Sequence, residues 1–179
     1  IKAEIPQWDF AKVVQNADAK WNKALAKIDI KADADTKTIF YTSLYHTMFA
    51  PSIFNDANGD YRGTDKKVYK NAGFVNYTTF SLWDTYRALH PLYTITQEDK
   101  INDIVKTFLA IYQQQGRLPV WHLMGNETDC MNANHSIPVI VDAYFKGYRN
   151  YDVNLAYEAI KKTAMQTRAG MDYVQKLQY

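Results

Sequence analysis

Apolar residues at helical spacing are the feature that most constrains the fold of this chain. One stripe predicts an amphipathic helix that ends at Gly116, and it consists of Ile101, Ile104, Val105, Phe108, Ile111 and Tyr112. A second stripe predicts a helix from about Asp9 to Ile28, and it consists of Val14, Ala17, Trp21, Leu25 and Ile28. The sequence therefore predicts a mainly α protein.

Three more segments have helical patterns. Residues 39–50 form an aromatic-rich helix that ends before Pro51. Residues 136–145 carry apolar side chains on nearly every face, which predicts a buried helix. Asp152 is a candidate N-cap for a fifth helix that continues to about residue 164.

Two long segments, residues 55–79 and 117–135, do not have a helical pattern. The dipeptide Asn58-Gly59 is a turn signal, and residues 75–80 are rich in Tyr, Thr and Phe, so we expect a short β-hairpin near residues 66–80. Long loops inside a helical domain are commonly functional. The candidate chemistry is therefore sought in and beside these segments.

Composition limits the classes of protein that need consideration. A chain of 179 residues is long enough for one domain with a core. The formal charge is +2 with scattered Lys and Arg, which argues against nucleic acid and against a membrane surface as partners. No stretch is apolar enough for membrane insertion, and the single Cys130 excludes an internal disulfide.

Glu127 is the first candidate catalytic residue. It follows Gly125 and Asn126 in an expected loop between two helices, close to Trp121 and Met124, whose apolar bulk could raise the pKa of a carboxyl toward that of a general acid. The alternative is a loop glutamate that caps the next helix or pairs with an arginine.

Asp84 is the second candidate, in the segment from Trp83 to Arg87. An aspartate beside a tryptophan can accept hydrogen bonds from sugar hydroxyls while the ring covers one face of the sugar. The alternative is the first turn of a helix, in which Asp84 pairs with Arg87 at i+3. His122 lies beside the Glu127 segment, as does Trp121, and both are further candidates for contact with a substrate.

Metal motifs are weak. Asp56, Asn58 and Asp60 have the spacing of an EF-hand opening, but Tyr61 replaces the required glycine and Lys67 the final glutamate, so we interpret this segment as a turn. The four histidines lack the spacing of a helical zinc site.

Several motifs in order resemble the α-mannosidases of glycoside hydrolase family 92, and the resemblance runs through nearly the whole chain. They are Tyr41–Met48, Asp60–Gly63, Tyr77–Arg87, His90–Leu92, Gly125–Met131, Ile137–Ile140 and Asp142–Tyr144. The resemblance implies a calcium-dependent, exo-acting, inverting enzyme, of the α-1,2 type, that cleaves mannose-containing glycans. It also implies an (α/α)6 toroid, with Glu127 as general acid and Asp84 in contact with the reacting sugar.

The resemblance also implies parts that this sequence lacks. The family's N-terminal β-sandwich domain, and C-terminal catalytic segments that carry the general base and help to form the calcium site, do not occur in residues 1–179. We therefore expect a partial catalytic domain whose calcium ligands lie elsewhere, whose open helix faces favour self-association, and whose source is a periplasmic or secreted bacterial protein. The alternative is a non-catalytic mannose-binding or helical interaction module.

Overall fold

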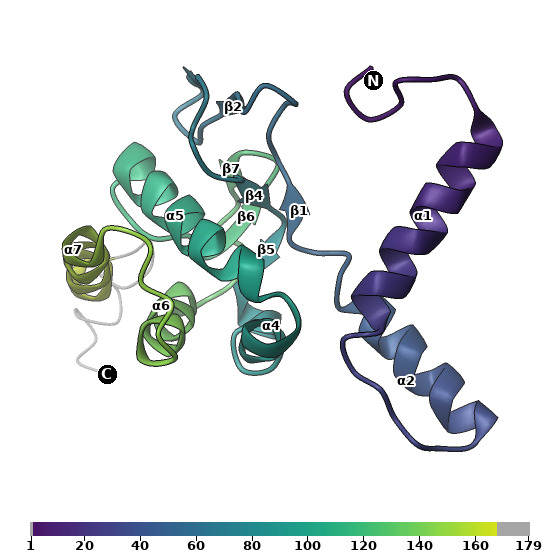
Figure 1. The fold of residues 1–179 in the computed structure, drawn as a ribbon. Helices are drawn as coiled ribbons and strands as arrows, with labels where there is room; N and C mark the ends of the chain where they lie inside the picture. Colours follow the sequence, from purple (N-terminus) through teal and green to yellow (C-terminus); the bar gives the residue numbers. More distant parts are fainter. Residues whose placement is uncertain (1, 168–179) are drawn as a thin grey trace.

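The computed structural model describes residues 2–167, and helices dominate it. Four helices, α4 to α7, pack around a common core, with small β-sheets at one end of it (Figure 1). The first two helices, α1 and α2, form an arm that extends to one side of this body (Figure 1). The predicted mainly α class is confirmed. Within the described residues, no helix combines the length and hydropathy needed to cross a bilayer.

Helix α5, Glu98–Gln115, is the centre of the core. Its apolar stripe is buried as predicted, and Phe108 and Val105 have no exposed surface. Gly116 ends the helix in the left-handed region, at φ 81°, where its N–H donates to the carbonyl of Tyr112 at 2.7 Å. A residue without a Cβ adopts this conformation at little cost, which explains why the helix stops there.

Helices α4, Leu89–Thr96, α6, Ser136–Phe145, and α7, Val153–Met165, cover α5. Asp152 caps α7 as predicted, because its side chain accepts the N–H of Leu155 at 2.9 Å. The bounds of α6 are also as predicted. The prediction that this helix is buried on all sides is wrong. Phe145 is 77% exposed, and only one face of the helix lies in the core.

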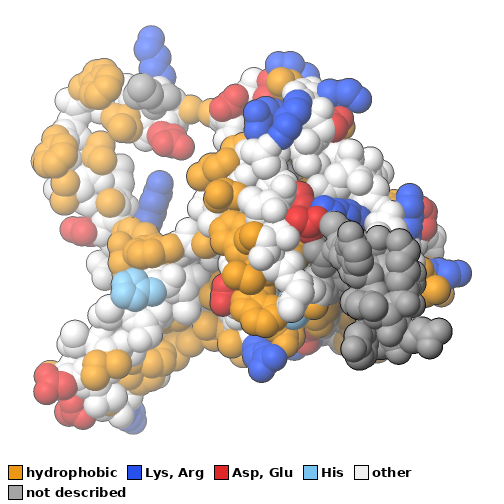
Figure 2. Space-filling model, turned by 180° about the vertical axis from the view of Figure 1, so that it is seen from behind, with side chains coloured by type: hydrophobic (Ala, Val, Ile, Leu, Met, Phe, Trp, Pro, Cys, Tyr) orange, Lys and Arg blue, Asp and Glu red, His pale blue; other side chains and the backbone are white. Residues whose placement is uncertain are grey.

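The arm consists of α1, Phe10–Leu25, and α2, Ala34–His46. Helix α2 begins and ends earlier than the predicted 39–50. It begins earlier because Asp33 caps its N-terminus by accepting the N–H of Thr36 at 2.9 Å. Trp21 packs edge-on against Tyr45 with ring centroids 4.5 Å apart. No residue of α1 is buried, and hydrophobic side chains lie open along the arm (Figure 2).

Strands of two or three residues occur in both segments that lack a helical pattern. Strand β1, Ser52–Ile53, pairs with β4, Tyr77–Thr78, and β2, Tyr61–Arg62, pairs with β3, Val68–Tyr69. A further sheet has the order β5–β6–β7, with bounds Phe80–Ser81, Trp121–Leu123 and Asn126–Glu127. The hairpin expected near 66–80 is thus formed by 61–69 instead. Thr79, at φ 65°, separates β4 from β5, so residues 75–80 contribute to two different sheets.

Gly63 is expected to tolerate no side chain. A Cβ placed there would lie 2.6 Å from a ring carbon of Tyr69, 2.8 Å from Asp65 Oδ1 and 2.9 Å from the amide carbon of Gln114. Because those groups hold the β2–β3 hairpin against α5, we expect Gly63→Ala to lower the free energy of unfolding by about 1–3 kcal/mol. Urea denaturation measures this. Gly63 lies outside the positive-φ region, so its cost comes from the clash, whereas Gly73→Ala adds a Cβ with no atom within 4 Å at φ 71° and shows the cost of backbone strain alone.

Candidate functional site

The β5–β6–β7 sheet brings the two candidate carboxylates into one part of the molecule. Strand β5 leads directly into the short helix α3, Leu82–Thr85, which carries Trp83 and Asp84. Across the sheet, Ser81 is opposite Trp121, and His122 is opposite Glu127. Segments about 40 residues apart in the sequence therefore become neighbours through strand pairing.

Glu127 lies in a β-hairpin and not in the expected interhelical loop. The turn between β6 and β7 consists of Met124 and Gly125, at φ 49° and 73°. Two consecutive residues with positive φ are what a two-residue type I′ hairpin turn requires, and its twist matches that of the strands. The Asn126-Glu127 pair is thus fixed by a tight turn.

Three backbone N–H groups hold the Glu127 carboxylate. Val120 donates to Oε2 at 2.8 Å, and Trp121 and Asp129 donate to Oε1 at 2.9 and 3.0 Å. This polar setting differs from the apolar one that the sequence suggested, because Met124 is 54% exposed and Trp121 contributes its backbone N–H. Glu127 is therefore positioned by its own hairpin, through hydrogen bonds from backbone N–H groups on both sides of it in the chain.

Asp84 lies in the first turn of α3, as the helical alternative predicted. Ser81 Oγ donates a hydrogen bond to Asp84 Oδ2, and the carboxylate is exposed. The predicted ion pair between Asp84 and Arg87 is wrong, since the Arg87 guanidinium instead donates to the hydroxyl of Tyr86 at 2.5 and 3.0 Å and lies over its ring. Asp84 therefore keeps acceptor capacity for an external hydroxyl.

Trp83, the neighbour of Asp84 in the chain, belongs to an aromatic cluster with His135 and Tyr86. Trp83 is 45% exposed, and its ring packs edge-on against His135 with centroids 5.7 Å apart. The imidazole of His135 in turn lies 4.2 Å from the ring of Tyr86. Partial burial and the nearby Arg87 guanidinium lower the pKa of His135, which favours its neutral form. An exposed indole beside an exposed carboxylate is suited to a sugar with one apolar face.

His122 differs from the other candidate residues because it lies under the sheet. Its side chain is 2% exposed, opposite Phe80, and burial lowers its pKa to about 4. Neither ring nitrogen has a hydrogen-bond partner among the described residues. In this structure His122 supports the hairpin from the core side.

The EF-hand-like segment is a turn, as predicted. The N–H of Gly59 donates to the carbonyl of Asp56 at 2.9 Å, and Asp60 accepts from Lys70 Nζ at 2.7 Å and from the N–H of Asn71 at 3.0 Å. Residues 2–167 contain no group of three or more His, Cys, Asp or Glu side chains that could hold a metal.

Sequence reasoning missed the partners that position the two carboxylates. Ser81 and Tyr86, which hold Asp84 and Arg87, lie in the same motif but have no signal of their own. The three N–H donors to Glu127 are backbone groups, and residue types do not reveal them. The dipeptide Met124-Gly125 was the available signal, because glycine readily takes the positive φ that such a turn needs.

A mainly helical domain in which one small sheet carries a fixed carboxylate and leads directly into a short helix with an exposed indole and a second carboxylate has the character of a carbohydrate-active protein. The catalytic domain of glycosyl hydrolase family 92 matches residues 1–179, and this chain belongs to that family.

Solved and curated relatives agree with this assignment. A family GH92 α-mannosidase from Bacteroides thetaiotaomicron is 41% identical over 97% of this chain, with a TM-score of 0.91, and has also been solved with mannoimidazole. An inverting GH92 mannosidase from the same species is 28% identical over 99% of this chain, with a TM-score of 0.85. A secreted glycosidase from Arthroderma benhamiae, described as uncharacterized, is 27% identical over 90% of this chain. The chain spans 24%, 26% and 17% of the lengths of these three proteins.

Proposed function

We propose that this chain is part of an exo-acting, inverting α-mannosidase of the α-1,2 type, with Glu127 as general acid and Asp84 as a ligand of the reacting mannose. The observation that carries the proposal is the sheet that joins Asp84, beside the exposed Trp83, to the hairpin of Glu127. The solved relatives include an inverting mannosidase and an α-mannosidase bound to mannoimidazole, which supports a mannoside as substrate.

The hydrogen bonds of Glu127 are compatible with proton donation from one of its two oxygens. Oε1 accepts two N–H groups, whereas Oε2 accepts one, so Oε2 has room for a proton. Once that proton moves to the departing glycosidic oxygen, all three N–H groups stabilise the carboxylate that remains. Arg87 and Trp121 would complete the binding surface for the sugar, with His122 supporting it from below.

An inverting mechanism needs a second carboxylate about 6.5–9.5 Å from the acid to activate water. We propose that this base, and the calcium ligands, come from segments outside residues 1–179, since the described residues do not form a metal site. In this proposal the chain is a partial catalytic domain of an (α/α)6 toroid, and the parent protein is periplasmic or secreted and bacterial. The secreted fungal relative supports export.

A second candidate function is glycan binding without catalysis. It is favoured by the exposed Trp83 and Asp84, which could hold mannose without a base. The exposed apolar faces of the arm would then serve self-association or a helical partner. Methyl α-mannoside binding with no hydrolysis by the full-length parent protein, with and without calcium, would establish this hypothesis and contradict the enzymatic one.

Glu127→Gln in the full-length parent protein is expected to reduce hydrolysis of α-mannobiose by about 10²–10⁴-fold, because the departing sugar needs a proton. Hydrolysis of α-mannosyl fluoride, whose leaving group needs none, should change much less. Comparing the two rates distinguishes proton donation from a purely structural role of the Glu127 hydrogen bonds.

Equal loss on both substrates would contradict the role of Glu127 as acid, because damage to the hairpin affects every substrate. The Glu127→Gln side chain would also place its N–H₂ group against a backbone N–H, so the melting temperature of the variant must be measured in parallel. Thr128→Ser, which keeps the hydroxyl that donates to the Trp121 carbonyl at 2.8 Å, is the matched control on the same hairpin.

A further inference from the structure

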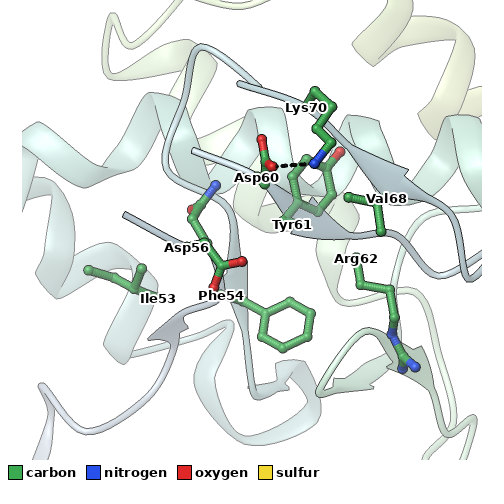
Figure 3. A pocket seen from close by; sticks show the side chains of 9 residues that line it. Ile53, Phe54, Asp56, Asp60, Tyr61, Arg62, Val68 and Lys70 are labelled. Atoms are coloured by element: carbon green, nitrogen blue, oxygen red, sulfur yellow. Dashed lines mark hydrogen bonds and ion pairs between the residues drawn. The ribbon is translucent and has the colours of Figure 1, made fainter. Parts of the chain in front are cut away.

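A polar pocket lies beside the turn of the Glu127 hairpin. It has a volume of about 370 Å³ and lies between the segment that follows β1 and the β2–β3 hairpin. Figure 3 shows Phe54, Asp56, Arg62 and Lys70 among the side chains that line it. Its volume is in the usual range of small-molecule sites, about 300–1,000 Å³.

The lining of the pocket combines an aromatic ring with hydrogen-bonding groups of both kinds. Phe54 supplies an apolar surface, and the exposed Asp56 carboxylate is an acceptor. Arg62 uses one N–H group in a bond of 3.3 Å to the carbonyl of Met124 and has four others for a ligand. These groups are the complement of a sugar ring, which has apolar C–H faces and hydroxyls at its rim.

The charges in the pocket favour a neutral ligand. Asp60 forms an ion pair with Lys70 at 2.7 Å, and hydrogen bonding to that ammonium is the largest cause of a lowered pKa for Asp60. The remaining charged groups of the lining are Asp56 and Arg62, one of each sign. The lining therefore has no net charge, which disfavours an anion or a cation as its principal ligand.

The pocket is preformed, because its lining residues are held by contacts within the chain. Asp60 also accepts from the side chain of Asn58 at 3.0 Å and from the N–H of Asn71 at 3.0 Å, which ties the turn to the segment that follows β3. The rings of Tyr61 and Tyr69 stack with centroids 5.3 Å apart. A preformed site loses less conformational entropy when a ligand binds.

The pocket shares a wall with the hairpin of Glu127. A Cβ at Gly125 would lie 3.0 Å from the Phe54 ring and 3.2 Å from the carbonyl of Arg62, so backbone and ring are in close contact. Lys66 extends from the β2–β3 turn to the side-chain oxygen of Asn126. An occupant of the pocket would therefore lie next to the turn that positions Glu127.

From these observations we propose that the pocket binds a neutral hexose unit of the glycan substrate, remote from the scissile bond. The inference rests on the proposed function, because the hairpin that contacts this pocket carries the proposed acid. It identifies the substrate class as an oligosaccharide that extends along the hairpin. Single mannosides would occupy the Asp84 site alone.

Backbone amide shifts in two-dimensional NMR spectra test the inference, with methyl α-mannoside and an α-linked mannotriose as probes. Mannotriose is expected to shift the amides of Phe54, Asp56 and Val68 together with those of Trp83 and Asp84, and methyl α-mannoside only the latter pair. Asp56→Ala should weaken mannotriose binding by about tenfold and leave methyl α-mannoside binding unchanged.

Asp18→Ala is the matched control, because it removes an equally exposed carboxylate from α1. Asp56→Asn, which keeps an acceptor oxygen, should restore most of the affinity. If mannotriose shifts the amides of Trp83 and Asp84 but not those of Phe54 and Asp56, the proposed hexose site in the pocket is contradicted and the proposed function is not. Shifts at neither place with either probe would overturn both.

Discussion

Lowering the pH from 7 to 4 is expected to weaken the fold by several kcal/mol, chiefly through His90 and His122. Both side chains are at most 3% exposed, and burial lowers the pKa of each from 6.5 to about 4. The unfolded chain binds these protons near pH 6.5, whereas the folded chain resists them until about pH 4. Their contribution is therefore complete above pH 6.5 and is lost as the pH falls toward 4, by about 3 kcal/mol each.

Urea denaturation at pH 7 and pH 4 measures this loss. His90→Leu removes an imidazole that lies among Phe80, Tyr93 and Phe108, and it should reduce the pH dependence by about half. His46→Leu removes an exposed imidazole from α2 and is the control. An unchanged pH dependence in His90→Leu would contradict the account. Three carboxyl groups have a lowered pKa in the folded chain, those of Asp33, Asp60 and Asp65. Their protonation at still lower pH removes a further contribution to stability.

Phe108→Ala is expected to lower the free energy of unfolding by about 3–5 kcal/mol. Phe108 has no exposed surface, and its ring packs edge-on against Phe80 with centroids 4.8 Å apart. Removing it opens a cavity between α5 and the β5 strand, which a close-packed interior cannot fill. The melting temperature should fall by roughly 10 °C for a chain of this size.

Calorimetry of Phe108→Ala and Phe145→Ala separates burial from residue type. Phe145, at the end of α6, is 77% exposed, so its truncation should cost less than about 0.5 kcal/mol. Because Phe80 begins the sheet that carries Glu127, Phe108→Ala should also reduce the proposed mannoside binding near Asp84. A small effect of Phe108→Ala on stability would show that the α5 core repacks.

The helices were predictable because they depend on local signals. Gly116 and Asp152 bound α5 and α7 where the sequence suggested, since a left-handed cap and an N-cap need only one residue type. Helix α4 was missed because Pro91 in its first turn resembles a helix breaker, although proline is tolerated there. The shift of α2 toward Asp33 follows from a cap that was overlooked.

The sequence indicated which residues belong to the candidate site, but it did not indicate how they are arranged in space. Strands of two or three residues are too short for an alternating pattern, so the sheet that joins Asp84 to Glu127 left no periodic signal. The bonds of the Glu127 carboxylate come from backbone N–H groups six to seven residues before it and two after it. Tertiary pairing determines such contacts.

The arm of α1 and α2 has a consequence for how the molecule unfolds. No residue of α1 is fully buried. The arm is tied to the body near its base, where the Tyr93 hydroxyl donates to the carbonyls of Thr47 and Ala50 at 2.6 and 3.1 Å and the Lys27 ammonium donates to the carbonyl of Thr96. Few interactions couple the stripe of α1 to the α5 core. We therefore expect the arm to be a separate cooperative unit, in which amide protons exchange through local opening well before the helices of the body open.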